Sequence, residues 1–192
     1  VWTPSPDIVY PPDFQTYINV EDVTRPLEGA HRPGHFRGVT TVVAKLLNVF
    51  QPTRVYFGQK DAQQVAVIKQ MVGDLNFNLD VVVGPTVREA DGLALSSRNS
   101  NLGPEARHQA VCLFRALNAA KTAFEQGQLD GNRLRAIMLE VLEIAPLAKV
   151  DYVSVAHPTT LKELDTVKEG ALLSMAVFVD GVRLIDNMLV GS

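Results

Sequence analysis

Two short apolar runs, residues 54–57 and 79–83, constrain the fold most, because a single helical segment separates them. Residues 79–83 read Leu-Asp-Val-Val-Val, which is typical of a strand buried on both faces. The segment between the runs starts at about Asp61, and its apolar residues recur on one side of a helix: Val65, Ile68, Val72 and Leu75. Parallel neighbours in a sheet need such a crossover connection. The sequence therefore predicts a parallel sheet with crossover helices.

A further helix is expected before these elements, and irregular structure before that helix. The apolar residues after position 38 form one helical stripe, which Pro52 ends: Val39, Val42, Val43, Leu46, Leu47 and Phe50. Residues 1–38 contain six prolines and three glycines, so we expect irregular structure there, with one short strand around residues 17–20.

The second half of the sequence has the pattern of a small α+β unit. Pro104 suits the first position of a long helix, whose apolar face carries Ala110, Leu113, Phe114, Leu117 and Phe124. A second helix is expected after Gly131. Three strand-type runs follow, at residues 149–155, 171–179 and 182–189. Asp180-Gly181 between the last two predicts a tight hairpin, and hence an antiparallel sheet.

Composition excludes several classes of protein. Eighteen Lys and Arg against 21 Asp and Glu give a net charge of −3, which leaves no basic excess for nucleic acid as the main partner. The apolar runs are far shorter than the roughly 20 residues of a membrane span. The single cysteine, Cys112, rules out an internal disulfide framework and a multi-cysteine zinc site. The cytoplasm is the expected compartment.

The start of the sequence has the character of an internal segment. It has no initiator methionine and no signal-peptide or transit-peptide composition. Residues 1–4 read like the end of a strand that enters a loop. We therefore expect that the sequence lacks the beginning of a longer chain.

The first segment that could carry chemistry is residues 57–64, Phe-Gly-Gln-Lys-Asp-Ala-Gln-Gln, where a parallel strand gives way to a helix. Ligands bind at this edge of open α/β sheets, and a helix N-terminus offers unpaired N–H groups to an anion. Gly58 allows close approach of the backbone, and Lys60 adds a charge suited to phosphate. Alternatively, Asp61 and Gln64 have the spacing of a capping box.

The second segment is residues 87–99, which follow the second buried strand. Its two hydroxyls, Ser96 and Ser97, and the guanidinium of Arg98 could surround a polyphosphate with short charge-assisted hydrogen bonds. The alternative is a solvated turn in which Asp91-Gly92 reverses the chain. The nearby strand–glycine–lysine segment favours the phosphate interpretation.

Other polar groups point less clearly to function. Residues 29–38 contain His31, Arg32, His35 and Arg37, and this basic loop could close over an acidic ligand or be an exposed linker. Pro33 and Gly34 argue against a helical His31–His35 metal pair. His108 and His157 are expected at the surface or in structural roles, and Cys112 in packing.

Five segments together resemble the pantothenate synthetase (pantoate–β-alanine ligase) family. They are residues 10–14 (YPPDF), 32–39 (RPGHFRGV), 57–64 (FGQKDAQQ), 87–99 (VREADGLALSSRN) and 184–187 (LIDN), and the match runs in order over the whole sequence. The lysine and double-serine segments are the specific ones.

The resemblance implies an ATP-dependent, AMP-forming ligase of the nucleotidylyltransferase superfamily. Pantoate and ATP would form pantoyl adenylate and pyrophosphate, and the amine of β-alanine would then displace AMP to give pantothenate. The implied ATP-binding residues are Gly58, Gln59, Lys60, Asp61, Val87, Leu95, Ser96, Ser97 and Arg98. Among these, Lys60 and Arg98 would be catalytic, and Gln64 would bind pantoate. Mg²⁺ is expected as a further charge, with its ligands unassigned.

The resemblance also sharpens the fold prediction and the oligomeric state. It implies an α/β fold: the second half of a Rossmann-like nucleotidylyltransferase domain, which also binds pantoate, over residues 1–88. A small α+β C-terminal domain with an antiparallel sheet would follow over residues 89–192. The family usually forms homodimers, so a homodimer is expected.

The sequence departs from the family pattern in several places. Leu95 stands where many members have methionine, a volume-conserving change that should leave ATP binding intact. Gln59 and Ala62 differ from the common glutamate and aromatic residue. The family's HIGH-like segment, a glycine-rich turn with two histidines, does not occur in the sequence, nor does the first pantoate-binding glutamine. We therefore expect these 192 residues alone not to form pantoyl adenylate at an appreciable rate.

Two other functions are compatible with the same residues. One is another adenylyl- or cytidylyltransferase that shares the phosphate loops, which Gln64 and competition by pantoate would distinguish. The other is a folded oligomerisation or regulatory fragment without catalysis, which failure of a full-length form to bind ATP would favour.

Overall fold

The computed structural model describes residues 2–191, which form two compact units. The first unit comprises the described residues up to Phe57 together with Gln63–Val82. The second comprises Gly58–Ala62 together with the described residues from Val83 onward. The short segment Gly58–Ala62 thus belongs with the C-terminal part of the chain, while the division at residue 88 stays a prediction.

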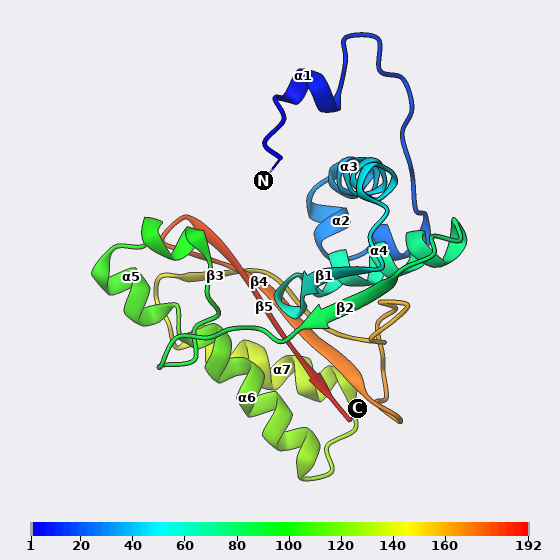
Figure 1. The fold of residues 1–192 in the computed structure, drawn as a ribbon. Coiled ribbons are helices and arrows are strands. Elements are labelled where there is room, and N and C mark those ends of the chain that lie inside the picture. The colour runs from blue at the N-terminus through cyan, green and yellow to red at the C-terminus, as the bar shows by residue number, and fades with distance from the viewer. Residues whose placement is uncertain (1, 192) are drawn as a thin grey trace. The chain divides into compact units, whose positions relative to one another are not determined.

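The first unit contains most of the α/β part (Figure 1). Its helices are α1 (Pro6–Val9), α2 (Glu28–His31), α3 (His35–Phe50) and α4 (Ala62–Asp74), with a 3-10 turn, η1, at Asp22–Thr24. Strands β1 (Arg54–Gly58) and β2 (Asp80–Gly84) form a two-stranded parallel sheet, and α4 connects them. The predicted strand–helix–strand crossover is therefore confirmed.

Three predictions for this part of the chain were wrong in detail. Residues 17–20 form no strand, because hydroxyls of α3 satisfy the backbone of Ile18: its N–H donates to Thr41 Oγ1 (3.0 Å), and its carbonyl accepts from Thr40 Oγ1 (2.6 Å). Helix α3 starts four residues earlier than expected, and its most buried side chains are Phe36, Thr40, Thr41, Ala44 and Leu47. Of the expected stripe only Leu47 is fully buried, and Phe50 is exposed.

The predicted flexible loop at residues 29–38 is largely helical. Residues 29–31 belong to α2 and residues 35–38 to the first turn of α3. Gly34 makes the sharp change of direction between them with a φ of 78°, which is unstrained for glycine. His31 and His35 therefore lie on different helices.

The second unit is an antiparallel sheet covered by helices. Its strands are β3 (Ala148–Ala156), β4 (Ala171–Val179) and β5 (Val182–Val190), in the order β3-β4-β5. The helices are α5 (Pro104–Gln109), α6 (Cys112–Glu125) and α7 (Gly131–Glu143), and 3-10 turns occur at Gln59–Asp61 (η2) and Ser97–Asn101 (η3). Figure 1 shows α6 and α7 packed on one face of this sheet. Taken together, the two sheets confirm the predicted α/β class with a separate antiparallel part.

The β4–β5 hairpin has the predicted two-residue turn. Asp180 and Gly181 both have positive φ, 48° and 79°, as the tight turn between twisted antiparallel strands requires. The turn sets the register, which pairs Val179 with Val182 and continues to Ala171 with Val190.

The single long helix predicted from Pro104 is instead two helices. The N–H of Leu113 bonds to the carbonyl of Ala110 (3.3 Å), a tighter i→i+3 bond that separates α5 from α6. Cys112 packs in the core, and burial raises the pKa of its thiol to about 11, so it is an inert packing residue as expected. Within the described part of the chain, no helix is long and apolar enough to cross a membrane.

Gly92 supplies a test of how the loop after β2 packs on α6. Its φ is 95°, and an added Cβ would lie 2.0 Å from Cδ1 of Phe114. We expect Gly92→Ala to lower the free energy of unfolding by about 3 kcal/mol, from overpacking and backbone strain. Urea denaturation followed by circular dichroism measures this loss.

Gly103→Ala is the matched control, because Gly103 has a φ of −65° and no atom within 4 Å of the added Cβ. Its effect should stay within about 1 kcal/mol, which is the cost of alanine at this helix N-cap. Equal losses in both variants would contradict the packing described for Gly92.

Candidate functional site

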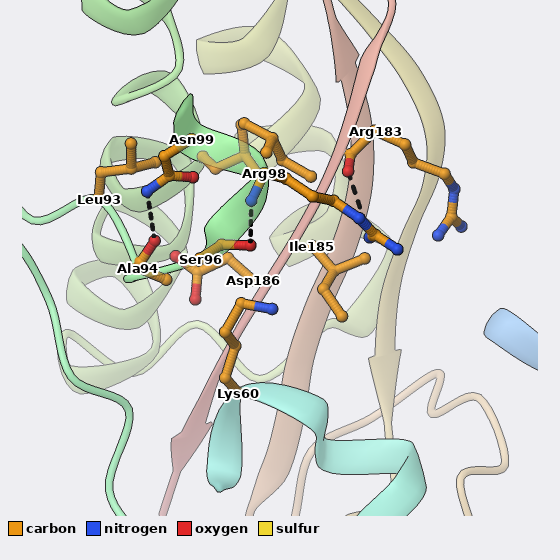
Figure 2. Close-up of a pocket in the computed structure, with 11 residues that line it drawn as sticks. Lys60, Leu93, Ala94, Ser96, Arg98, Asn99, Arg183, Ile185 and Asp186 are labelled. Carbon is orange, nitrogen blue, oxygen red and sulfur yellow. Dashed lines mark hydrogen bonds between the residues drawn. The ribbon is translucent and has the colours of Figure 1, made fainter. Parts of the chain in front are cut away.

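The two segments singled out in the sequence meet at one pocket of the second unit (Figure 2). Lys60 comes from η2, Ser96 and Arg98 come from the loop after β2, and β5 forms another side. The lining residues are Lys60, Leu93, Ala94, Ser96, Arg98, Asn99, Leu113, Arg183, Leu184, Ile185 and Asp186. The hollow measures about 280 Å³ including its open side, and its free space accommodates about one water molecule. The larger part of any ligand would therefore lie in the open mouth.

The first loop, residues 58–61, carries Lys60, and the side chain of Asn187 on β5 holds its backbone in place. The side-chain amide of Asn187 donates to the carbonyls of Gln59 (3.1 Å) and Lys60 (2.8 Å), and its Oδ1 accepts from Nε2 of Gln59 (3.0 Å). The Lys60 side chain is 20% exposed, and its ammonium lies 4.0 Å from the Asp61 carboxylate. The charge of Lys60 is thus presented at the pocket wall rather than free in solvent.

The second loop, residues 87–99, is held to the same strand, β5, by a buried ion pair. Arg88 donates from both terminal nitrogens to Asp186, at 2.6 and 2.9 Å, and Asp186 is only 2% exposed. The guanidinium also stacks on Phe114 of α6, 4.8 Å from the ring centroid. This bidentate geometry fixes the start of the loop in direction as well as position.

A second arginine closes the loop on itself. Arg107 of α5 donates to Asp91 Oδ2 and to Glu89 Oε2, each at 2.8 Å. Asn99 donates to the other oxygen of Glu89 (3.1 Å) and to the carbonyl of Ala94 (3.1 Å). The hydrogen bonds from Arg107 lower the pKa of both carboxyls below their ordinary values, and Asn99 adds to the shift of Glu89.

The hydroxyl and guanidinium groups follow directly on this closed loop. Ser96 Oγ accepts the N–H of Arg98 (3.2 Å) and caps η3. The Arg98 side chain extends along the pocket, where it donates to the carbonyl of Arg183 (3.4 Å) (Figure 2). Ser97 is exposed at the start of η3 and does not line the pocket. Within residues 2–191, this long bond to a neutral carbonyl is the one hydrogen bond of the Arg98 side chain that a ligand would have to displace.

Two apolar side chains project next to the charged groups of the second loop. Val87 is 62% exposed and Leu95 is 50% exposed, and the N–H of Leu95 bonds to the carbonyl of Val87 (2.9 Å). The hydrogen bond brings the two residues side by side. An exposed apolar pair beside Ser96 and Arg98 is suited to the flat face of a nucleobase.

The two neighbouring glutamines of the first motif differ in their surroundings. Gln63 is 5% exposed: its Oε1 accepts the N–H of Glu28 (2.9 Å), and its Nε2 donates to the carbonyls of Val23 (2.9 Å) and Pro26 (2.8 Å). It therefore stabilises the segment before α2. Gln64, on α4 in the first unit, is half-buried and does not line the pocket of the second unit.

Sequence reasoning missed the residues that hold the loops. Two segments that resemble the family contain these residues: Arg88, Asp186 and Asn187. Their partners are distant, however: Arg88 and Asp186 are 98 positions apart, and Asn187 and Gln59 are 128 positions apart. Arg107 had no signal beyond its charge. Among the described residues, no group of three or more His, Cys, Asp or Glu side chains could hold a metal ion.

Comparison with known proteins supports one family. Residues 1–189 match the family model described as pantoate-beta-alanine ligase. The chain belongs to the pantoate–β-alanine ligase family. It is 58% identical over 190 residues to the pantothenate synthetase of Herpetosiphon aurantiacus, covering 98% of this chain and 69% of that relative. Sequence resemblance and family model therefore agree.

Solved structures of the pantoate–β-alanine ligase family share the fold. The crystal structure of pantothenate synthetase from Thermus thermophilus superposes with a TM-score of 0.91 at 46% identity, over 95% of this chain and 66% of that one. The pantoate-beta-alanine ligase of Francisella tularensis, complexed with beta-gamma ATP and beta-alanine, gives 0.72 at 32% identity, over 95% and 61%. The chain thus spans about two thirds of the length of its relatives.

The Arg107 contacts predict a pH-dependent stability. The pKa of Glu89 and of Asp91 is lower in the folded chain than their ordinary values of 4.5 and 3.8. The two carboxylates therefore stabilise the folded chain fully at a pH above their ordinary pKa values. This stabilisation is lost as the pH falls through their lowered pKa values in the folded chain. We expect Arg107→Gln to be less stable than the parent chain at pH 7, with a difference that shrinks below about pH 4.

Urea denaturation at several pH values measures that difference. Arg133→Gln is the control, since it breaks the exposed Arg133–Glu140 ion pair, and such pairs contribute little to stability. A gap between parent and Arg107→Gln that stays constant from pH 7 to pH 3 would contradict the assigned contacts.

Proposed function

We propose that this chain supplies the two triphosphate-binding loops of an ATP-dependent ligase that condenses pantoate with β-alanine. The observation that carries the proposal is that Lys60 and Arg98, from separate loops, line one pocket together with Ser96. The similar pantothenate synthetases, and the Francisella structure complexed with beta-gamma ATP and beta-alanine, support the same substrates.

The first step joins pantoate to the α-phosphorus of ATP. A carboxylate oxygen of pantoate attacks, the bond to the bridging oxygen breaks, and pyrophosphate leaves with the bonding electron pair. The products are pantoyl adenylate and pyrophosphate. No protein side chain needs to form a covalent bond, so catalysis rests on positioning and on cations near the developing charge.

Lys60 and Arg98 are the proposed catalytic residues of this step. Lys60 would place its ammonium against the phosphates from the first loop, and Arg98 would present its planar guanidinium from the second. The hydroxyls of Ser96 and Ser97 and the backbone around Gly58, Gln59 and Asp61 would complete the phosphate contacts. Val87 and Leu95, adjacent and exposed, would contact the adenine side.

Gln64 is the proposed ligand of pantoate. Its amide has one donor pair and one acceptor, which suits a substrate with hydroxyl and carboxylate groups. The contrast with Gln63 supports this role, because Gln63 uses its amide within the fold while Gln64 is half-buried on the same helix.

Mg²⁺ is proposed to arrive with ATP, and its protein ligands stay unassigned. The described residues contain no cluster of carboxylate and histidine ligands, and Asp186 is engaged by Arg88. Mg²⁺ characteristically binds through substrate phosphates and water. The substrate is thus the magnesium complex of ATP.

In the second step the neutral amine of β-alanine attacks the acyl carbon of pantoyl adenylate. AMP leaves, the amine gives up a proton, and the amide bond of pantothenate forms. Holding amine and acyl group together supplies the main acceleration. The resemblance further leads us to propose a cytoplasmic homodimer.

Removing the Lys60 ammonium tests the first step. The test protein is a fusion of the upstream part of the Herpetosiphon relative to this chain. Pantoate-dependent ATP–pyrophosphate exchange would be measured for this fusion with and without each substitution. Lys60→Ala should lower the rate by about 10²–10³-fold, as the loss of one preorganised charge-stabilising donor does. Lys149→Ala, which removes an exposed lysine of β3, should leave the rate within about twofold.

Near-normal exchange by Lys60→Ala would refute the role of Lys60. Exchange that proceeds without pantoate, or that a second nucleotide supports better, would instead indicate another nucleotidylyltransferase.

The 192 residues alone should show little exchange. The histidine-containing glycine-rich turn that steadies the phosphates in the family does not occur in this sequence. Radiolabelled pyrophosphate incorporation into ATP by the purified chain measures this directly, with the fusion as the positive control. Robust incorporation by the chain alone would show that the remaining loops suffice.

A further inference from the structure

Asn187 is a buried polar residue next to the pocket whose contacts the proposed chemistry does not use. It is 4% exposed, and both its amide nitrogen and its amide oxygen are directed to Gln59 and Lys60. Only the backbone of Lys60 is involved, at 2.8 Å, so the ammonium remains at the pocket wall. The contacts therefore constrain where Lys60 stands without neutralising its charge.

The position of Asn187 on β5 explains how one strand holds two loops. Consecutive residues of a strand point to opposite faces. Asp186 pairs in register with Met175, on the face covered by α6 and α7, and there it binds Arg88 of the second loop. Asn187 pairs with Ser174 on the other face, where it binds the first loop.

We propose that Asn187 is a positioning residue for the phosphate site: its amide holds the backbone of Gln59 and Lys60 so that the Lys60 ammonium faces Ser96 and Arg98. The assignment rests on the proposed function, because it acts through Lys60. It goes beyond that function by naming a residue that touches neither ATP nor pantoate.

Asparagine is specifically suited to this role. Its nitrogen donates to two carbonyls while its oxygen accepts one N–H, so both ends of the amide are used. Aspartate has the same shape but no donor, and it would place a carboxylate oxygen against the carbonyls of Gln59 and Lys60. Asn187→Asp thus changes the hydrogen bonding of the first loop with little change in side-chain volume.

The test is a double-mutant cycle on ATP affinity in the full 192-residue chain. Binding of the magnesium complex of ATP is measured by calorimetry for the parent, Asn187→Asp, Lys60→Ala and the double variant. We expect Asn187→Asp to weaken binding about tenfold in the parent, as an unsatisfied buried hydrogen-bonding group does. In the Lys60→Ala background the same change should weaken it by less than about twofold, because the residue acts through Lys60.

Ser174→Ala is the matched control. Ser174 lies directly opposite Asn187 in the register, and its buried hydroxyl has no hydrogen-bond partner among the described residues. Its removal alters the same buried neighbourhood without touching the first loop, so ATP affinity should be unchanged. A thermal melt of each variant confirms that binding is measured on folded protein.

A milder variant keeps the assignment testable if Asn187→Asp fails to fold. Gln59→Met removes the bond from Gln59 Nε2 to Asn187 Oδ1 at a half-buried position. It should weaken ATP binding about threefold in the parent and by a smaller factor in the Lys60→Ala background.

The outcomes separate the two proposals. If the parent chain binds ATP no better than Lys60→Ala, the proposed function fails, and this assignment fails with it. If the parent binds ATP more tightly than Lys60→Ala, but Asn187→Asp matches the parent or weakens both backgrounds equally, only the positioning role is refuted. If Asn187→Asp weakens ATP binding in the parent but not in the Lys60→Ala background, the positioning role is supported.

Discussion

The buried pair between Arg88 and Asp186 is the interaction on which the site depends. Asp186 is 2% exposed, and it accepts two hydrogen bonds from Arg88 and one from the N–H of Asn187. A carboxylate so far from water is stable only because its oxygens are satisfied and its charge is paired. The pair contributes little net stability compared with an apolar contact, but its planar two-point geometry fixes the direction in which the second loop leaves β2.

The positions of the Arg98 and Lys60 charges depend on this pair, one step after another. With Arg88 fixed, the Arg107 contacts close the loop, and the closed loop carries Ser96 and Arg98 to the pocket. Asn187, one residue beyond Asp186, holds the first loop from the other face of the same strand. Two cations from distant parts of the chain are thereby brought together although they repel each other. A polyphosphate is the kind of ligand that makes this arrangement favourable.

The sequence predicted several local features correctly. The crossover through α4 followed from periodicity, and the Asp180-Gly181 turn from residues that tolerate positive φ. Some of the failures involved partners that are distant in the sequence, and others were local. Residues 17–20 form no strand, and Ile18 bonds instead to hydroxyls of α3, which no strand pattern reveals. The bidentate role of Arg88 needed the position of β5, a hundred residues later, and the break before α6 followed from a single tightened bond at Ala110. The resemblance named the charged groups; only the fold shows what holds them.

The most direct test of the account is a crystal structure with a non-hydrolysable analogue of ATP and Mg²⁺. We expect the Lys60 ammonium and the Arg98 guanidinium both to lie within about 3 Å of oxygens of the same triphosphate. We also expect Arg98 to have left the carbonyl of Arg183. A triphosphate that engages one of these side chains while the other stays in its ligand-free position, or that binds away from both, would contradict it.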